Sequence, residues 1–378
     1  MRKLLVIIYI LALKAEAQSS ALDIGNDLFA KGNYTKAVKA YLEYNDSTAV
    51  FDKIAKSYMA LGLTNKAVLY YEKSFNAFPD NELIMYNYAK ILLSTKQYNK
   101  ASHLFEKLIY KDYKNPNYHY QKGLVLEKMK DSMEKAIDRF NSAFRLDNSH
   151  QKSIVKLAKY YIKKRRHQSV DFYVDRGLEY ALQSPSLHSL KAQNYYYKED
   201  YAKAIVWFEK LIALGESSEF IHEKLSLSYG HEYEYKKAIE QRKKVLEYNA
   251  MDAVSMYVIG QYYQRLNNHE EAEKWITKYL KLSDIPLDAE YTNLGMSYNY
   301  QKKYKEAIDA FKTALKEDSN NISAQFFLVR TKDEFYKDID AKIKLYKDFK
   351  DKYPKSPFLP MAEMRLSELK KEKFLDQD

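Results

Sequence analysis

The side chains that most often perform catalysis or bind metals are not grouped along this chain. There is no cysteine, which excludes disulfides, thiolate nucleophiles and cysteine-ligated zinc or iron–sulfur clusters. The eight histidines are scattered, and no two of them stand four residues apart, as two metal ligands on one helical face would. The glycines form neither of the two common phosphate-binding patterns, GxGxxG and GxxxxGK[ST]. We therefore predict a protein that is not an enzyme and has no cofactor and no metal site.

Four lysines with helical spacing are the strongest candidate for a binding function. Their separations of 4, 3 and 4 residues would place them in one stripe on a helix, and no acidic residue lies between Asp147 and Asp171. Such a stripe could recognise an acidic peptide, or the anionic group of a glycan or a lipid. The alternative is an ordinary solvated helix face. The four residues are Lys152, Lys156, Lys159 and Lys163.

The net charge favours anionic partners without identifying nucleic acid. The formal charge is +11 for the whole chain. It falls to +9 without residues 1–17, which carry three basic residues and one acidic residue. Outside the stretch from Asp147 to Asp171, acidic residues are distributed throughout the sequence. We expect a protein or peptide partner, which could be acidic, and no nucleic acid. The oligomeric state is left open.

The elements that must position these residues follow from two linked series of small side chains. One series recurs every 30 to 35 residues, and a bulky residue follows four positions later in most repeats: Ala37, Ala67, Ala101, Ala136, Val170, Ala204, Ala238, Ala272 and Ala307. The other lies upstream, and a leucine or tyrosine follows three positions later: Gly25, Ala55, Ala89, Gly123, Ala158, Ala192, Ser226, Gly260 and Gly295. Two antiparallel helices approach closely only where one presents a small side chain. The series therefore predict helix pairs, each covering the apolar face of the next.

This pattern resembles the tetratricopeptide repeat (TPR) family. The clearest unit is Tyr291-x2-Leu294-Gly295-x2-Tyr298 followed by Ala307-x3-Phe311, against the family's W-x2-L-G-x2-Y…A-x3-F. The resemblance covers roughly residues 20–356. It implies an all-α, right-handed superhelical solenoid of about 9–10 helix-turn-helix repeats, over residues 18–356. Residues 357–378 are expected to supply a capping helix and a tail.

Some units depart from the family pattern. The first spacing is four residues short, and Val170 replaces alanine in the fifth unit. The seventh unit has Arg242 at the position where most other units have a bulky apolar side chain.

The first 17 residues have the layout of a secretory signal peptide. Arg2 and Lys3 precede an apolar run over residues 4–13, and residues 15–17 supply a small-x-small cleavage pattern before Gln18. The run is shorter than the roughly 20 residues of a membrane-spanning helix. We expect export to the periplasm or cell envelope of a Gram-negative bacterium. The alternative is a membrane-tethered TPR assembly factor whose N-terminal segment is not cleaved.

The resemblance also implies a binding surface. TPR ligands usually lie in a concave groove lined by the first helix of each pair. Tyrosine gives a large contact area with few rotamers to freeze, which suits an extended peptide, although packing within repeats is the alternative. We therefore predict a scaffold or adaptor that binds a peptide or protein, with an anionic glycan or lipid as the alternative ligand. Besides the four lysines, the expected groove residues are Lys56, Tyr86, Lys90, Tyr120, Lys128, Gln193, Tyr196, Tyr197, Tyr257, Gln261, Arg265, Asn299 and Tyr300.

Overall fold

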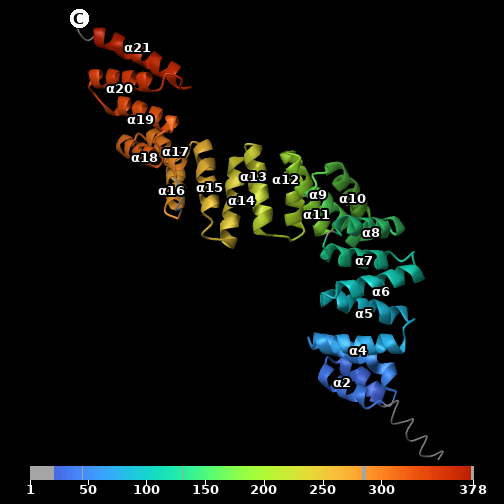
Figure 1. Ribbon diagram of the computed structural model, residues 1–378. Helices are drawn as coiled ribbons and strands as arrows, with labels where there is room; N and C mark the ends of the chain where they lie inside the picture. Colours follow the sequence, from blue (N-terminus) through green and yellow to red (C-terminus); the bar gives the residue numbers. More distant parts are fainter. Residues whose placement is uncertain (1–20, 45, 131, 283–286, 376–378) are drawn as a thin grey trace, which may run out of the picture. The chain divides into compact units, whose positions relative to one another are not determined.

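The computed structural model describes residues 21–44, 46–130, 132–282 and 287–375. Every regular element within these ranges is a helix, as Figure 1 shows, so the all-α prediction is confirmed for them. The chain divides into two units, Met1–Leu190 and Lys191–Asp378. The predicted signal peptide, residues 1–17, lies outside the described residues. None of the described helices combines the length and the hydrophobicity that a membrane span requires.

Unit 1 (Met1–Leu190) is a row of helices in which each element packs against the next (Figure 1). Residues 21–30 are helical and precede the labelled elements. These are α2 (Tyr34–Leu42), η1 (Ser47–Val50), α3 (Phe51–Ala60), α4 (Thr64–Ala77), α5 (Glu82–Ser94), α6 (Tyr98–Lys111), α7 (Pro116–Lys128), α8 (Met133–Leu146), α9 (Gln151–Lys163) and α10 (His167–Tyr180). The helix α11 (Pro185–Tyr197) contains the boundary between the units.

Unit 2 (Lys191–Asp378) repeats the same arrangement, with neighbouring helices in contact along the chain. Its elements are α12 (Tyr201–Ala213), α13 (Glu219–His231), α14 (Tyr235–Tyr248), α15 (Ala253–Arg265), α16 (His269–Leu280), α17 (Asp288–Tyr300), α18 (Tyr304–Glu317), α19 (Ile322–Phe335), α20 (Ile339–Lys352) and α21 (Leu359–Leu375). Odd-numbered helices up to α19 are the first helices of the predicted pairs, and even-numbered ones are the second.

The small residues lie where two helices of a pair touch. Every member of the series that begins at Ala37 is fully buried. A methyl group added at Gly123 of α7 would lie 2.5 Å from the ring of Phe140 on α8, and one added at Gly295 would lie 2.7 Å from the ring of Phe311. These distances are too short for a side chain, so the close approach of the helices depends on the missing Cβ. The pairing of small and bulky residues predicted from the repeat is therefore present.

The last helix, α21, packs against α20 through an apolar face that includes Leu366 and Leu369. An ion pair adds to this contact, because Arg365 Nε donates to Oδ2 of the buried Asp333 on α19 at 2.8 Å. Tyr346 Oη donates to the same oxygen at 3.0 Å. Burial alone would raise the pKa of Asp333, but these hydrogen bonds and the charge of Arg365 outweigh it and lower the pKa. The carboxylate thus joins α19, α20 and α21.

Candidate binding groove

A groove of about 640 Å³ runs over the first helices α13, α15 and α17 of unit 2. We call it the α15 groove. Its walls carry amides, rings and one exposed arginine, and no carboxylate is among the residues that line it. These residues are Leu227, Gly230, His231, Tyr235, Gln261, Tyr262, Gln264, Arg265, Asn267, His269, Asn293, Met296 and Tyr300.

A second hollow of about 330 Å³ adjoins the groove and shares Met296 and Tyr300 with it. It lies over α17 and α19, where Lys302 and Arg330 contribute positive charge and Glu334 contributes the one negative charge among its lining residues. The remaining lining residues are Asn299, Tyr304, Phe327 and Thr331. The exposed surface therefore continues from one first helix to the next.

Amide side chains hold successive first helices in register beneath this surface. Gln264 Nε2 of α15 donates to the backbone oxygen of Asn293 and to Ser297 Oγ on α17, both at 2.8 Å. Asn299 Nδ2 of α17 donates to Thr331 Oγ1 on α19 at 2.6 Å. The other amide atom, Asn299 Oδ1, is buried and accepts no hydrogen bond from the described residues. Polar contacts thus replace apolar packing at the floor of the groove.

Stacked rings form one edge of the groove. His269, the first residue of α16, stacks on Tyr300, the last residue of α17, with ring centroids 4.2 Å apart and planes 6° from parallel. His231 stacks on Tyr201 in the same way, at 4.0 Å and 6°. Burial lowers the pKa of His269, so its ring is neutral at pH 7. These pairs present flat ring faces to a ligand, and the His269–Tyr300 pair does so without adding charge.

The floor of the groove is shaped by Gly230 on α13. A methyl group at this position would overlap the hydroxyl of Tyr262, which reaches across from α15. Tyr262 Oη lies 3.5 Å from the backbone oxygen of Ser226, its nearest acceptor on α13. The absence of a side chain at Gly230 therefore lets the ring of Tyr262 lie over α13 and line the groove.

Four of the predicted binding residues meet at this surface. Gln261, Arg265 and Tyr300 line the α15 groove, and Tyr300 is 65% exposed. Asn299 lines the adjoining hollow. Their equivalent places in the repeat register put them on the same face of successive first helices, so the period alone brings them together. The register did not select Tyr262, Asn293 or His269.

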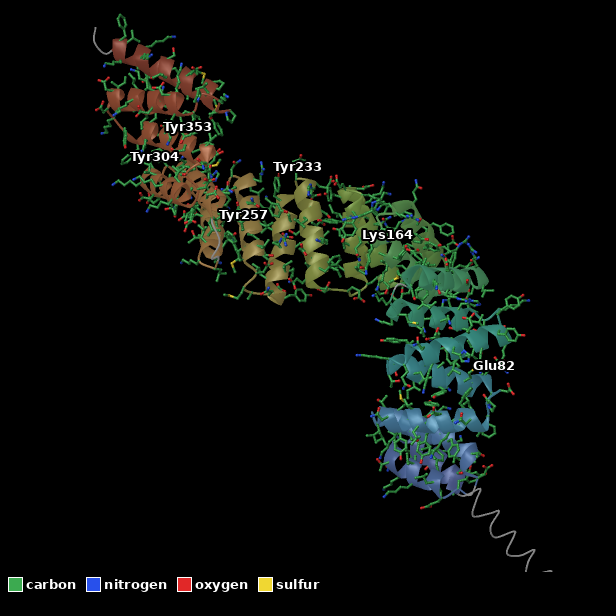
Figure 2. All side chains as sticks on the ribbon, in the orientation of Figure 1. Glu82, Lys164, Tyr233, Tyr257, Tyr304 and Tyr353 are labelled. Carbon is green, nitrogen blue, oxygen red and sulfur yellow. The ribbon has the colours of Figure 1, made fainter. Side chains whose placement is uncertain are left out.

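The predicted residue Tyr257, labelled in Figure 2, packs between helices instead of lining either hollow. Its ring lies 5.0 Å from that of Tyr279 on α16, and its hydroxyl accepts a hydrogen bond from Asn293 Nδ2 at 2.6 Å. Gln193, Tyr196 and Tyr197 on α11 are partly buried and also lie outside the two hollows. The Nζ atom of Lys224 sits 5.2 Å above the ring of Tyr196.

The lysine stripe is on α9 of unit 1, as its spacing predicted, but it is not free of acids. Lys152, Lys159 and Lys163 are exposed. Lys156 Nζ instead pairs with Glu127 of α7 at 2.6 Å. Glu127 of the preceding first helix thus places a carboxylate beside α9, whose own sequence contains no acidic residue. The stripe therefore consists of three exposed lysines and of Lys156, whose charge is paired.

The remaining predicted residues of unit 1 have partners in the same repeat or in the next one, or are exposed. Lys56 pairs with Asp52 at 2.9 Å, and Lys90 Nζ lies 5.5 Å above the ring of Tyr86. Tyr86 Oη also accepts a hydrogen bond from Gln121 at 3.3 Å.

Tyr120 packs on Phe140, and Lys128 is exposed at the end of α7. Among the described residues of the chain, no group of three histidine, aspartate or glutamate side chains is placed to hold a metal ion.

Comparisons with known proteins agree with this architecture. Family models described as tetratricopeptide repeat match residues 58–123, 253–285 and 289–321. A TPR repeat-containing protein of Methanocaldococcus jannaschii is 25% identical over 264 residues, which cover 66% of this chain and 44% of that protein. The chain therefore spans less than half the length of this curated relative.

Solved structures with the same repeat are also similar. The C-terminal part of a TPR repeat-containing protein from Cytophaga hutchinsonii matches with a TM-score of 0.51 at 18% identity, over 64% of this chain and 99% of that one. A tetratricopeptide repeat protein from Parabacteroides merdae matches with a TM-score of 0.40 at 15% identity, over 76% and 99% of the two chains. At 18% identity the first match bears on the fold alone. Together, the repeat models and the TPR relative support a protein of the tetratricopeptide repeat family, and the packed helix pairs agree with it.

Proposed function

We propose that this protein is an exported, non-catalytic scaffold that binds an extended segment of a partner protein along the first helices of unit 2. The observation that carries the proposal is the α15 groove, an open surface lined by amides, stacked rings and Arg265. TPR proteins as a class act as interaction scaffolds, and the fold alone does not name a partner.

The chemistry of the groove suits a polypeptide. An extended peptide presents one N–H and one C=O group per residue, and the exposed amide of Gln261 can both donate and accept hydrogen bonds. The exposed ring of Tyr300 offers a rigid apolar contact for a side chain. Arg265 can form a bidentate hydrogen bond with a carboxylate.

The binding proposal is tested with random dodecapeptides displayed on phage and selected on the whole protein. Selected peptides, made synthetically, should bind the wild type and bind an Arg265→Glu, Tyr300→Ala variant at least about tenfold more weakly, since Arg and Tyr side chains dominate such contacts. Lys316→Glu is the matched control, because it makes the same charge change at an exposed position of α18 outside both hollows. Equal binding to all three proteins would count against the groove.

The export proposal needs a separate measurement. The protein is produced in a Gram-negative host and its N-terminus is determined by mass spectrometry. A mature chain beginning at Gln18 in the periplasmic fraction is the expected result. An intact N-terminus in the membrane fraction would instead support the tethered alternative, and an intact N-terminus in the cytoplasm would reject export.

A further inference from the structure

One charged side chain is buried behind the α15 groove. Arg242 of α14 is 3% exposed and occupies the position that holds a bulky apolar side chain in the other repeats, such as Phe208 and Ile276. Phe208 and Ile276 are each buried against the first helix of their own pair. A guanidinium at such a position is exceptional, because a buried charge is unfavourable unless it is paired.

Arg242 has no carboxylate within ion-pair distance among the described residues. Its Nη1 lies 3.4 Å from Ser255 Oγ, and its Nε has no hydrogen-bond partner in this part of the chain. Ser255 in turn donates a hydrogen bond to the carboxylate of Asp252. One hydroxyl therefore separates the cation from that carboxylate, and the positive charge is only partly compensated.

The cation contacts α15, the helix that carries Tyr262, through Ser255, and its charge acts on the Tyr262 hydroxyl. Burial raises the pKa of the Tyr262 hydroxyl, and the nearby positive charge of Arg242 opposes that shift. Tyr262 lines the groove, and it can do so because Gly230 leaves room for its hydroxyl. Ser226, the small residue of this pair, donates its hydroxyl to the backbone oxygen of Ala238 at 2.8 Å instead of pairing with Arg242. The departures at Gly230 and Arg242 thus occur together, on two helices of one pair and beneath one surface.

We propose that Arg242 is a specificity-determining residue that makes the α15 groove prefer a peptide segment with a carboxylate above Gly230 and Tyr262. This rests on the proposed peptide-binding function and adds the chemical class of the segment. Charges in a low-dielectric interior act over longer distances than exposed ones and are little screened by salt. Arg265 supplies a second, exposed cation on the same wall, and no lining residue supplies a negative charge. The carboxylate can belong to an aspartate or glutamate side chain or to the end of the partner chain.

The test uses a peptide selected as above, in three synthetic forms. The acidic form keeps its acidic residues, and the amide form has them replaced by asparagine or glutamine. The amidated form keeps the acidic residues but has an amidated C-terminus. Affinities for the wild type and for Arg242→Met are measured by fluorescence anisotropy at low and high salt. Methionine is unbranched and apolar, so it fills the site without the charge.

We expect the acidic form to bind the wild type about tenfold more tightly than the amide form, as one unit charge acting through protein of moderate dielectric would produce. Arg242→Met should lose the part of this preference that persists at high salt, while binding the amide form as the wild type does. Because the charge is buried, the part of the preference due to Arg242 should persist at high salt, whereas the part due to Arg265 should fade. The amidated form identifies the source, since only a C-terminal carboxylate is removed by amidation.

Two results would overturn the inference. An equal preference for the acidic form in both proteins would show that Arg242 does not set it. Equal weakening of the acidic and amide forms in Arg242→Met would show a purely structural role. If peptides bind the groove with no preference for acids, the inference fails and the proposed function stands. If no peptide depends on Arg265 and Tyr300, both fail together.

Discussion

Adding one methyl group at Gly123 tests whether glycine is needed there for close packing. In Gly123→Ala the new Cβ would lie 2.5 Å from Cε1 and 2.7 Å from Cδ1 of Phe140, whose side chain is 1% exposed. Alanine in a helix is favoured over glycine by roughly 1 kcal/mol. Overpacking a core opposes this with typically about 1–3 kcal/mol. Because a fully enclosed ring cannot move aside freely, we expect a net loss of about 1 kcal/mol in the free energy of unfolding.

The loss should remain modest for a reason found in the neighbouring pair. There, Ala89 of α5 and Phe105 of α6 occupy the equivalent positions and both are fully buried. The repeat can therefore accept alanine if the two helices stand slightly farther apart. Gly123→Ala forces α7 and α8 toward that spacing, and the cost is the strain passed to their other contacts.

The assay is denaturant unfolding followed by circular dichroism, with amide exchange of α7 and α8 as the local measurement, since repeat arrays need not unfold in one step. Phe140→Leu shortens the opposing side chain and provides a double-mutant cycle. The double variant should be more stable than the sum of the single effects predicts, by about 1 kcal/mol. A Gly123→Ala protein as stable as the wild type, with no coupling to Phe140, would refute the packing argument.

Two further predictions concern charge in unit 2. Arg242→Met should raise the free energy of unfolding by roughly 1–3 kcal/mol, because well-packed apolar residues often stabilise a protein when they replace a buried charge. The exposed control Arg265→Met should change it by less than about 0.5 kcal/mol. Denaturant midpoints measure both effects, and an Arg242→Met protein less stable than the wild type would refute the prediction. The lowered pKa of Asp333 means that its contribution is complete above its unfolded pKa of about 3.9 and is lost as pH falls through its folded pKa. Amide exchange of α21 should therefore accelerate in that acid range, and Asp333→Asn, which should cost about 2 kcal/mol at pH 7, should remove this pH dependence.

The helix pairs could be predicted because the information for them is local and repeated. A small residue, a bulky residue one turn later and a fixed period are enough to place two helices in contact. The same period placed Gln261, Arg265 and Tyr300 on the groove side of their helices, where the structure has them. The sequence could therefore predict the face of the helix on which a side chain lies wherever that face follows from the repeat register alone.

Contacts between repeats were out of reach because they join residues about 30 positions apart. The pairing of Lys156 with Glu127 could not be read from the acid-free segment around the lysine. Near the C-terminal end of α19, which continues to Phe335, Asp333 is buried. Its partner, Arg365, comes from α21, so no local pattern could show that an aspartate there would be helical and ion-paired.

The departures from a repeat carry information of another kind. The other eight helix pairs have an apolar or aromatic side chain at the position of Arg242, and such a side chain would also suit the pair that contains Arg242. The arginine therefore does not stabilise the fold at that site. The same holds for Gly230, since a glycine within a helix is unfavourable by roughly 1 kcal/mol relative to alanine. Gly230 lies against Tyr262, the charge of Arg242 acts on the same hydroxyl, and Tyr262 and Gly230 line the α15 groove. Two unfavourable choices that converge on one surface are more simply explained by what that surface binds than by the stability of the helices beneath it.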